Sequence, residues 1–208
     1  MGPMSPIGLM SPISLIRPIS PISPISPISP ISPICPINPH YPHYPMIGQP
    51  QVYERLNSLN IPFTYTEHPA APTIEIGRQY WADLPGTHCK NLFFRNHKGN
   101  RHYLVIFQCD QNLAIHDLEH LLHQGKLSFA SEQRMQRYLG LMPGSVSPFG
   151  LVNDTEHHVH VFLDKNLQNY THLSFHPNDC HASLNITFDD FVRYMDASGN
   201  TYEWIELY

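Results

Sequence analysis

Apolar residues recur at two different spacings along residues 51–208, and the two spacings predict helices and strands. Val52, Leu56 and Leu59 lie three or four residues apart, which predicts a helix that ends at Asn60. Further helices are predicted by the same spacing or by a capping residue at the start: one with an apolar face of Leu118, Leu121 and Leu122, and three that begin at Thr73, Ser131 and Thr187 and run to about residues 83, 140 and 195.

Shorter apolar stretches between these helices alternate with polar residues, as strands do. A hairpin is predicted over residues 90–108, with its turn at 96–100. The other predicted strands cover residues 61–68, 127–130, 151–153, 159–163, 171–175, 182–186 and 203–207. Hairpins and helical connections occur together, so residues 51–208 are predicted to form one α+β domain, with flanking helices and a mixed, largely antiparallel sheet.

Residues 1–50 follow a different pattern. They hold fourteen of the 21 prolines, a run of Ser-Pro-Ile triplets and one charged residue, Arg17. Proline at every third position fixes φ and removes amide donors, so neither a helix nor a central strand can form there. Two interpretations are open: a disordered low-complexity tail, or a docking peptide for a proline-binding groove. The prolines also interrupt any secretory signal, and the chain has no run of roughly 20 apolar residues that could span a membrane.

Charge and cysteine content narrow the class of protein. The net charge is −5, and because the tail carries only Arg17, the acidic excess lies in residues 51–208. Four basic residues nevertheless cluster around the predicted hairpin: Lys90, Arg95, Lys98 and Arg101. A local positive patch on an acidic domain fits a short piece of RNA better than a long one. Cys35, Cys89, Cys109 and Cys180 show no C-x-x-C spacing and are expected to be free thiols in the cytoplasm.

The fifteen histidines raise the question of a metal. His116, His120 and His123 share one face of a predicted helix, and His158 and His160 share one face of a strand. Zinc needs three or four converging ligands, and no H-E-x-x-H frame is present. Solvent-exposed polar faces are the preferred interpretation, and no metal is expected.

Nucleophilic and nucleotide-dependent chemistry lack their usual motifs. The sequence around Ser145 follows a helix and lacks the G-x-S-x-G pattern. Cys89 and His88 are neighbours on a strand and are expected to point to opposite faces. The chain contains neither a Walker loop nor G-x-G-x-x-G, so no cofactor is predicted.

Three features could still bind or orient a substrate, and each has a structural alternative. Lys90 begins an otherwise apolar strand, where it either meets an anion such as phosphate or extends into water. The loop 144–150 either cradles a carbonyl or oxyanion with its backbone amides or is an ordinary turn. His176, followed by Pro177, either orients a substrate oxygen or caps a strand.

Seven segments in order resemble one family. They are E-H-P-A-A-P-T (67–73), L-P-G-T-H-C-K-N-L-F-F-R (84–95), K-G-N-R-H-Y-L-V (98–105), L-S-F-A-S (127–131), L-G-L-M-P-G-S-V-S-P-F-G-L-V-N-D (139–154), V-F-L-D (161–164) and F-H-P (175–177). Together they resemble the YbaK/ProX family and, within it, the freestanding prolyl-tRNA editing branch, related to the editing domain inserted in bacterial prolyl-tRNA synthetases. The resemblance covers residues 51–208. It implies a mixed α/β fold and hydrolysis of mischarged tRNA(Pro), typically alanyl-tRNA(Pro), without metal or cofactor.

The resemblance also implies roles for particular residues. Lys90 would hold the phosphate of the terminal adenosine, the loop from Gly144 to Pro148 would frame the aminoacyl group, and His176 would position the ester. Water would attack, assisted by the ribose hydroxyl of the substrate. The neighbouring motif residues are expected to bind substrate: His68, Thr73, Asn91, Ser145, Val146, Ser147, Pro148 and Phe149.

One segment departs from the family pattern, which continues after His-Pro with an asparagine and a threonine where this chain has Cys180 and Ser183. Serine keeps a hydroxyl, whereas cysteine loses a good donor and acceptor. The amino acid removed is therefore left open among alanine, cysteine and serine. A non-catalytic binding module of the same fold is the alternative function. The expected partner is the acceptor end of mischarged tRNA, with prolyl-tRNA synthetase as a candidate, and a monomer and a weak dimer are both compatible with the sequence.

Overall fold

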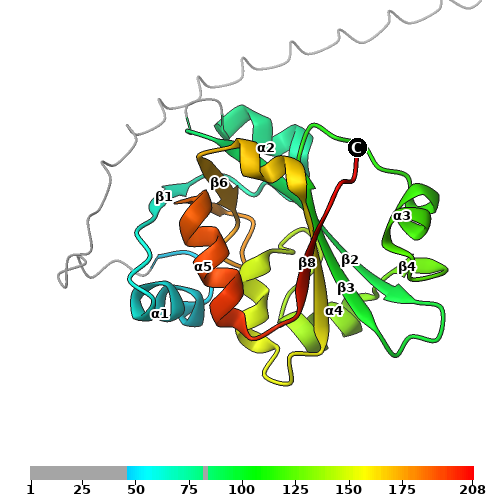
Figure 1. The fold of residues 1–208 in the computed structure, drawn as a ribbon. Helices are drawn as coiled ribbons and strands as arrows, with labels where there is room; N and C mark the ends of the chain where they lie inside the picture. The colour runs from blue at the N-terminus through cyan, green and yellow to red at the C-terminus, as the bar shows by residue number, and fades with distance from the viewer. Residues whose placement is uncertain (1–45, 82–83) are drawn as a thin grey trace, which may run out of the picture. The chain divides into compact units, whose positions relative to one another are not determined.

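The computed structural model describes residues 46–81 and 84–208, and its central element is a mixed eight-stranded sheet (Figure 1). The strands are β1 (Thr64–Glu67), β2 (Thr87–Asn96), β3 (His102–Gln108), β4 (Leu127–Phe129), β5 (Val159–Asp164), β6 (His172–Phe175), β7 (Ala182–Thr187) and β8 (Tyr202–Ile205). The helices are α1 (Pro50–Ser58), α2 (Ile74–Trp81), α3 (Ile115–Leu122), α4 (Glu132–Leu139) and α5 (Phe188–Ser198), with 3-10 helices η1 (Pro148–Asn153) and η2 (Lys165–Asn169).

The strand order is β1-β7-β6-β2-β3-β5-β8, and β4 pairs with β2 beside this path. Four pairings are antiparallel, and the three pairings β2–β6, β3–β5 and β5–β8 are parallel. The predicted α+β fold with a mixed sheet is therefore confirmed.

The long strand β2 has two different partners on one of its edges. β3 pairs with it from Cys89 to Arg95. On the opposite edge, β6 pairs with Thr87 and His88, and β4 pairs only with residues 94–96. Among the described strands, none pairs with residues 89–93 on that edge. The sheet is thus open between β6 and β4, and Lys90 and Asn91 lie at this opening.

Two apolar clusters cover the two faces of the sheet. The larger contains residues of α1, α4 and α5, and the smaller contains Leu118 and Leu122 of α3, on the other side in Figure 1. Adjacent residues of β2 alternate between them, with Phe93 in the larger cluster and Phe94 in the smaller. This alternation anchors β2 from both faces on the carboxyl side of the opening.

Most predicted elements are present within a few residues of their expected bounds. One is wrong: residues 151–153, expected as a strand, belong to η1. The Ser147 hydroxyl accepts a hydrogen bond from the Phe149 amide, and Pro148 follows it with a φ suited to a helical turn, so a 3-10 helix begins there. Leu121, expected on the apolar face of α3, is 39% exposed, because Leu118 and Leu122 fill the contact with the sheet.

Residues 46–50, placed in the tail from the sequence, contact the domain. The Ile47 amide donates to the Tyr65 hydroxyl at 2.8 Å, and the Gln49 side chain donates to the Gly140 carbonyl at 2.8 Å. The rest of the predicted tail, residues 1–45, lies outside the described residues. In the part of the chain that is described, no helix is long and apolar enough to cross a membrane.

Candidate functional site

A cavity of about 300 Å³ lies at the opening between β6 and β4. One wall is β2 from His88 to Leu92, and the opposite wall is the segment from Ala71 to Glu75 that leads into α2. Gly144 and Val146 of the loop before η1, together with residues of β6 and β7, complete it. Segments far apart in the sequence therefore meet at one point.

The cavity brings together part of the predicted site. Lys90, Gly144 and His176 all line it, and so do three of the predicted substrate-binding residues: Thr73, Asn91 and Val146. The remaining predicted residues do not: Ser145, Ser147, Pro148, Phe149 and His68. Phe149 is fully buried and packs edge-on against Phe175 and Tyr194, so it supports the loop from behind.

Lys90 has an apolar support and a polar contact. Its Nζ lies 5.9 Å from the centroid of the Phe107 ring and donates to Asn112 Oδ1 at 3.3 Å. Phe107 is the residue opposite Lys90 in the β2–β3 register. The aliphatic part of the Lys90 side chain therefore packs beside Phe107 of β3. An ammonium group carries three donors, so Lys90 can bind a further acceptor at the cavity.

Gly144 occupies a position that requires glycine. Its φ is +86°, in the left-handed region, and an added Cβ would lie 3.0 Å from Cβ of Pro72. A side chain at this position would have to displace Pro72 slightly and would strain the backbone, so glycine lets the loop lie close to this wall of the cavity.

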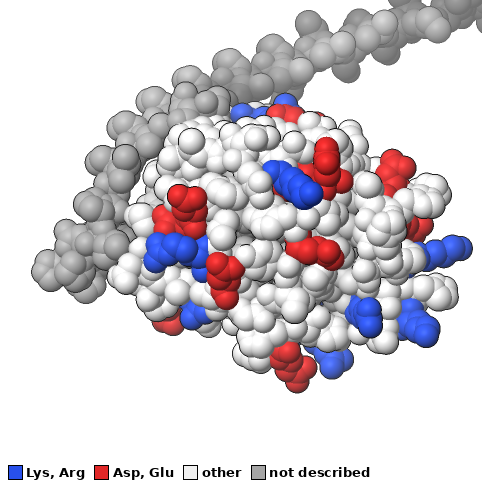
Figure 2. Space-filling view, in the orientation of Figure 1, with Lys and Arg blue, Asp and Glu red and all other residues white. Residues whose placement is uncertain are grey.

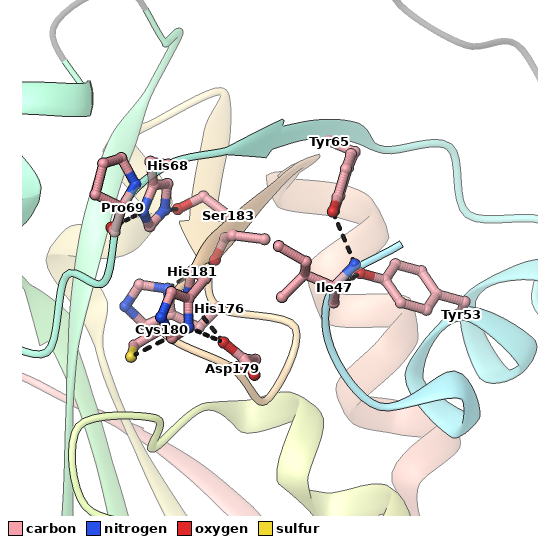
Figure 3. A network of polar contacts seen from close by, with 11 residues as sticks. Ile47, Tyr53, Tyr65, His68, Pro69, His176, Asp179, Cys180, His181 and Ser183 are labelled. Carbon is pink, nitrogen blue, oxygen red and sulfur yellow. Dashed lines mark hydrogen bonds and ion pairs between the residues drawn. The ribbon is translucent and has the colours of Figure 1, made fainter. Parts of the chain in front are cut away.

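Hydrogen bonds fix the protonated nitrogens of two histidines near the cavity. His176 Nδ1 donates to the Ala182 carbonyl at 2.8 Å, which leaves Nε2 as the acceptor of the neutral ring. Burial lowers the pKa of His176, so the ring is neutral at neutral pH. His68 Nδ1 donates to the Pro69 carbonyl, and its Nε2 accepts from the Ser183 hydroxyl, both at 2.9 Å (Figure 3). His68 does not line the cavity itself, but it contacts two residues that do: it accepts from Ser183, and its ring centroid lies 5.9 Å from that of His176.

A stacked pair at the cavity was not predicted. The rings of Trp81 and His88 lie 4.0 Å apart between centroids and are inclined by 8°. Burial, and after it the neighbouring His176 and His68, lowers the pKa of His88 to about 3, so this ring is also neutral. Gly77, one turn earlier on α2, makes room for the indole, since an added Cβ would lie 2.1 Å from a Trp81 ring carbon. The glycine four residues before a tryptophan was the available signal in the sequence.

Unpaired polar atoms gather at the same place. In the described part of the chain, eight buried side-chain atoms have no hydrogen-bond partner, and four of them belong to residues that line the cavity: Trp81 Nε1, His88 Nε2, Asn91 Oδ1 and Ser174 Oγ. Buried polar groups are normally paired, and leaving one unpaired costs about 1–3 kcal/mol. Such a concentration is typical of a site that a polar ligand completes.

The two departures from the family pattern lie in different places. Ser183 lines the cavity, whereas Cys180 does not, and its carbonyl accepts from the Ala71 amide at 2.8 Å. Cys89 lines the cavity, but burial raises the pKa of its thiol, which keeps it protonated and a poor nucleophile. Cys89, Cys109 and Cys180 are free thiols as predicted, and Cys35 lies outside the described residues.

The histidines considered as metal ligands contact different partners and do not converge on one point. His116 and His120 face each other at 3.3 Å, whereas His123 ends α3 with φ +50°. His158 bonds to His102, and His160 contacts Glu203. A different group in the described residues, Asp179, Cys180 and His181, has potential ligand atoms within 4.8 Å of one another. Asp179 Oδ1 already accepts from His181 Nδ1 at 2.7 Å (Figure 3), which accounts for the proximity of those two side chains.

Comparisons with known proteins identify the family of the chain. A family model described as an aminoacyl-tRNA editing domain matches residues 68–194. The prolyl-tRNA editing protein ProX of Acetoanaerobium sticklandii is 40% identical over 156 residues, which are 75% of this chain and 95% of that protein. Prolyl-tRNA synthetase associated domain-containing protein 1 of Danio rerio is 33% identical over 153 residues, 73% of this chain and 83% of that protein.

Solved structures resemble the fold of this chain. The crystal structure of the hypothetical protein APE2540 superposes with a TM-score of 0.59 at 15% identity, covering 74% of this chain and 98% of that one. At this identity the likeness concerns the fold. The family match and the sequence identities carry the classification, and they confirm the YbaK/ProX resemblance. The chain belongs to the aminoacyl-tRNA editing domain family.

Proposed function

We propose that this protein is a trans-editing deacylase that hydrolyses the ester of mischarged tRNA(Pro), with alanyl-tRNA(Pro) as its main substrate. The observation that carries the proposal is the meeting of Lys90, Gly144 and His176 in one cavity from three distant segments. The 40% identical relative is a prolyl-tRNA editing protein, which supports the choice of tRNA.

Each of the three residues has a role that its surroundings allow. Lys90 binds the phosphate of the terminal adenosine as a point charge at the entrance, or mouth, of the cavity. The loop from Gly144 to Pro148 holds the aminoacyl group against the Ala71–Glu75 wall, with Phe149 fixing the loop from behind. His176 offers the unprotonated Nε2 as an acceptor that orients the ribose hydroxyl or the attacking water.

The reaction needs no group on the protein to form a covalent bond. The oxygen of a water molecule attacks the ester carbonyl carbon, the bond from that carbon to the ribose oxygen breaks, and the proton passes to the ribose oxygen. Free amino acid and tRNA are the products. Positioning and exclusion of bulk water then supply the catalysis, which agrees with the high pKa of the Cys89 thiol.

Size discrimination explains why a second site is useful. The apolar pocket in which a synthetase selects proline distinguishes it from alanine by only about 1–3 kcal/mol, because each methylene that alanine lacks contributes little binding free energy. A smaller editing cavity that admits alanine and excludes proline adds the missing selectivity. Thr73, Asn91 and Val146 are the predicted residues that line this cavity, and His68 contributes by holding Ser183.

Two further assignments belong to the proposal. The chain comprises a low-complexity tail, predicted over residues 1–50, and an editing domain, predicted over residues 51–208. The contacts of residues 46–50 with the domain support a start of the domain before residue 51. Prolyl-tRNA synthetase is the candidate protein partner, and the tail is the segment available to recruit it.

A non-catalytic tRNA-binding module is the second candidate, favoured by the altered segment at Cys180 and Ser183. Incubation of the full chain with alanyl-, cysteinyl-, seryl- and prolyl-tRNA(Pro) distinguishes the two. The deacylase releases alanine fastest and leaves the prolyl ester intact. A pure binder releases no amino acid from any of them.

A further inference from the structure

Lys90, which lines the cavity, and Arg78, which lies beside it, contact the same short turn. Lys90 of β2 donates to Asn112, and Arg78 of α2 forms an ion pair with Asp110, two residues earlier. The turn follows β3 directly. The strand and the helix that form the two walls of the cavity thus each place a basic side chain on one turn.

A buried glutamine holds Asp110, the partner of Arg78, in place. Gln108, which is 8% exposed, donates through Nε2 to Asp110 Oδ2 at 2.6 Å and accepts from the Asp110 amide at 3.0 Å. The other carboxylate oxygen, Oδ1, faces Arg78. Gln108 is paired with Cys89, the neighbour of Lys90. The strand pair β2–β3, which carries Lys90, therefore also positions Arg78 through Gln108 and Asp110.

Arg78 also lies on the cavity side of α2. Glu75, one turn earlier on the helix, lines the cavity, and residues three apart share a helix face. The pKa of Glu75 is lowered first by its own backbone and by the Thr73 hydroxyl, and further by the charges of Lys90 and Arg78. Both cations therefore act on the same carboxylate at the mouth.

Stability alone gives little reason for this arrangement. The side chains of Arg78 and Asp110 are 57% and 53% exposed, and exposed ion pairs contribute little to folding. The guanidinium carries five donors, of which the bond to Asp110 uses one, so others can bind a phosphate. Figure 2 shows basic and acidic side chains interspersed over the visible face, with no broad basic surface on it.

We propose that Arg78, positioned by Asp110 and Gln108, binds a second phosphate of the RNA acceptor end, adjacent to the phosphate assigned to Lys90. The proposal rests on the proposed function, because it takes the acceptor end of tRNA as the ligand at this mouth. Lys90 then fixes the terminal nucleotide, and Arg78 sets the direction in which the preceding strand leaves the cavity.

The salt dependence of two separate measurements tests Arg78. Affinity for uncharged tRNA(Pro) and kcat/KM for alanyl-tRNA(Pro) are measured between 50 and 200 mM KCl, values chosen so that counterion release is measurable. In Arg78→Ala we expect KM and Kd to rise about tenfold with kcat nearly unchanged, and the slope of log affinity against log salt to fall by about 0.7, the value for one phosphate contact on a single strand.

Two further variants separate position from charge. Asp110→Asn keeps the charge of Arg78 but removes the ion pair that positions it. We therefore expect KM to rise while the slope of log affinity against log salt is retained. Arg193→Ala is the matched control, because Arg193 pairs with Asp190 on α5 and its side chain has a similar exposure, 52%. This variant removes the same charge, and we expect it to leave the salt dependence of both Kd and kcat/KM unchanged.

The outcomes distinguish this inference from the proposed function. Unchanged affinity and slope in Arg78→Ala, or equal losses in Arg193→Ala, overturn the role of Arg78 even when the wild-type chain deacylates normally. A chain that binds tRNA with the expected Arg78 dependence but releases no amino acid retains the phosphate contact and overturns the deacylase.

Discussion

The Trp81 indole stacks on the His88 imidazole with 4.0 Å between ring centroids, and the pair joins α2 to β2 beside the cavity. Both rings carry a buried nitrogen without a partner. The stack therefore fixes the distance between two walls of the site and at the same time presents unpaired polar groups there.

Gly77 is the first test of this relationship. In Gly77→Ala the new methyl group would overlap the Trp81 ring, so the indole must move away from His88. Alanine is about 1 kcal/mol better than glycine within a helix, so we expect little loss of stability and at least a tenfold loss of kcat/KM. The melting temperature and near-UV circular dichroism, measured with deacylation, check this. A variant with wild-type turnover and a displaced tryptophan would show that the stack is dispensable.

Lys90→Ala is expected to abolish deacylation and leave the fold intact. The lysine is partly exposed and its hydrogen bond to Asn112 is also exposed, so its removal costs little stability. Lys165→Ala, an exposed lysine in η2, is the control for loss of one positive charge. Turnover by Lys90→Ala equal to that of the Lys165 variant would disprove the phosphate role.

Acid is expected to destabilise the protein through its neutral buried histidines. The folded state lowers the pKa of His88 to about 3 and of His102 to about 4, both chiefly by burial, while the unfolded chain titrates near 6.5. The unfolded state binds more protons between these values. Stability is therefore fully present above pH 6.5 and falls as the pH drops toward 4, by at most about 1.4 kcal/mol per pH unit for each histidine.

Urea unfolding between pH 4 and 8 measures this dependence. His88→Asn should flatten the curve between pH 4 and 6.5, because one histidine with a lowered pKa is removed. A curve with the same slope in the variant would mean that His88 is protonated in the folded protein.

Metal removal is expected to have no effect on deacylation. The proposed reaction uses water, the ribose hydroxyl, the Lys90 ammonium group and the neutral His176, and Asp179, Cys180 and His181 do not line the cavity. Turnover is compared before and after dialysis against EDTA. A loss that added zinc restores would make this cluster part of the mechanism.

The sequence predicted the parts of the site that lie in short motifs. Lys90, Gly144 and His176 each occur in a segment with its own pattern, and the family resemblance linked them. The opening in the sheet could not be predicted, because it depends on β6 and β4 pairing with different ends of β2, and these partners come from distant segments. Periodicity describes one segment at a time.

Local ambiguity explains the other differences. The run at 151–153 is too short for periodicity to separate a strand from a helical turn, and the Ser147 cap decided it. The Trp81–His88 stack joins residues of two elements, and Gly77 gave only an indirect sign of it. Arg78 was likewise inconspicuous, because its importance depends on Asp110 and Gln108.

Release of labelled amino acid from tRNA(Pro) by the full wild-type chain tests the central claim most directly. Alanyl-tRNA(Pro) and prolyl-tRNA(Pro) are incubated in parallel, with spontaneous hydrolysis of each ester measured without protein. We expect the chain to deacylate the alanyl ester at least a hundredfold faster than the prolyl ester, roughly the selectivity that one apolar pocket fails to provide. Alanine release at the spontaneous rate, or equal release of both amino acids, would contradict the account.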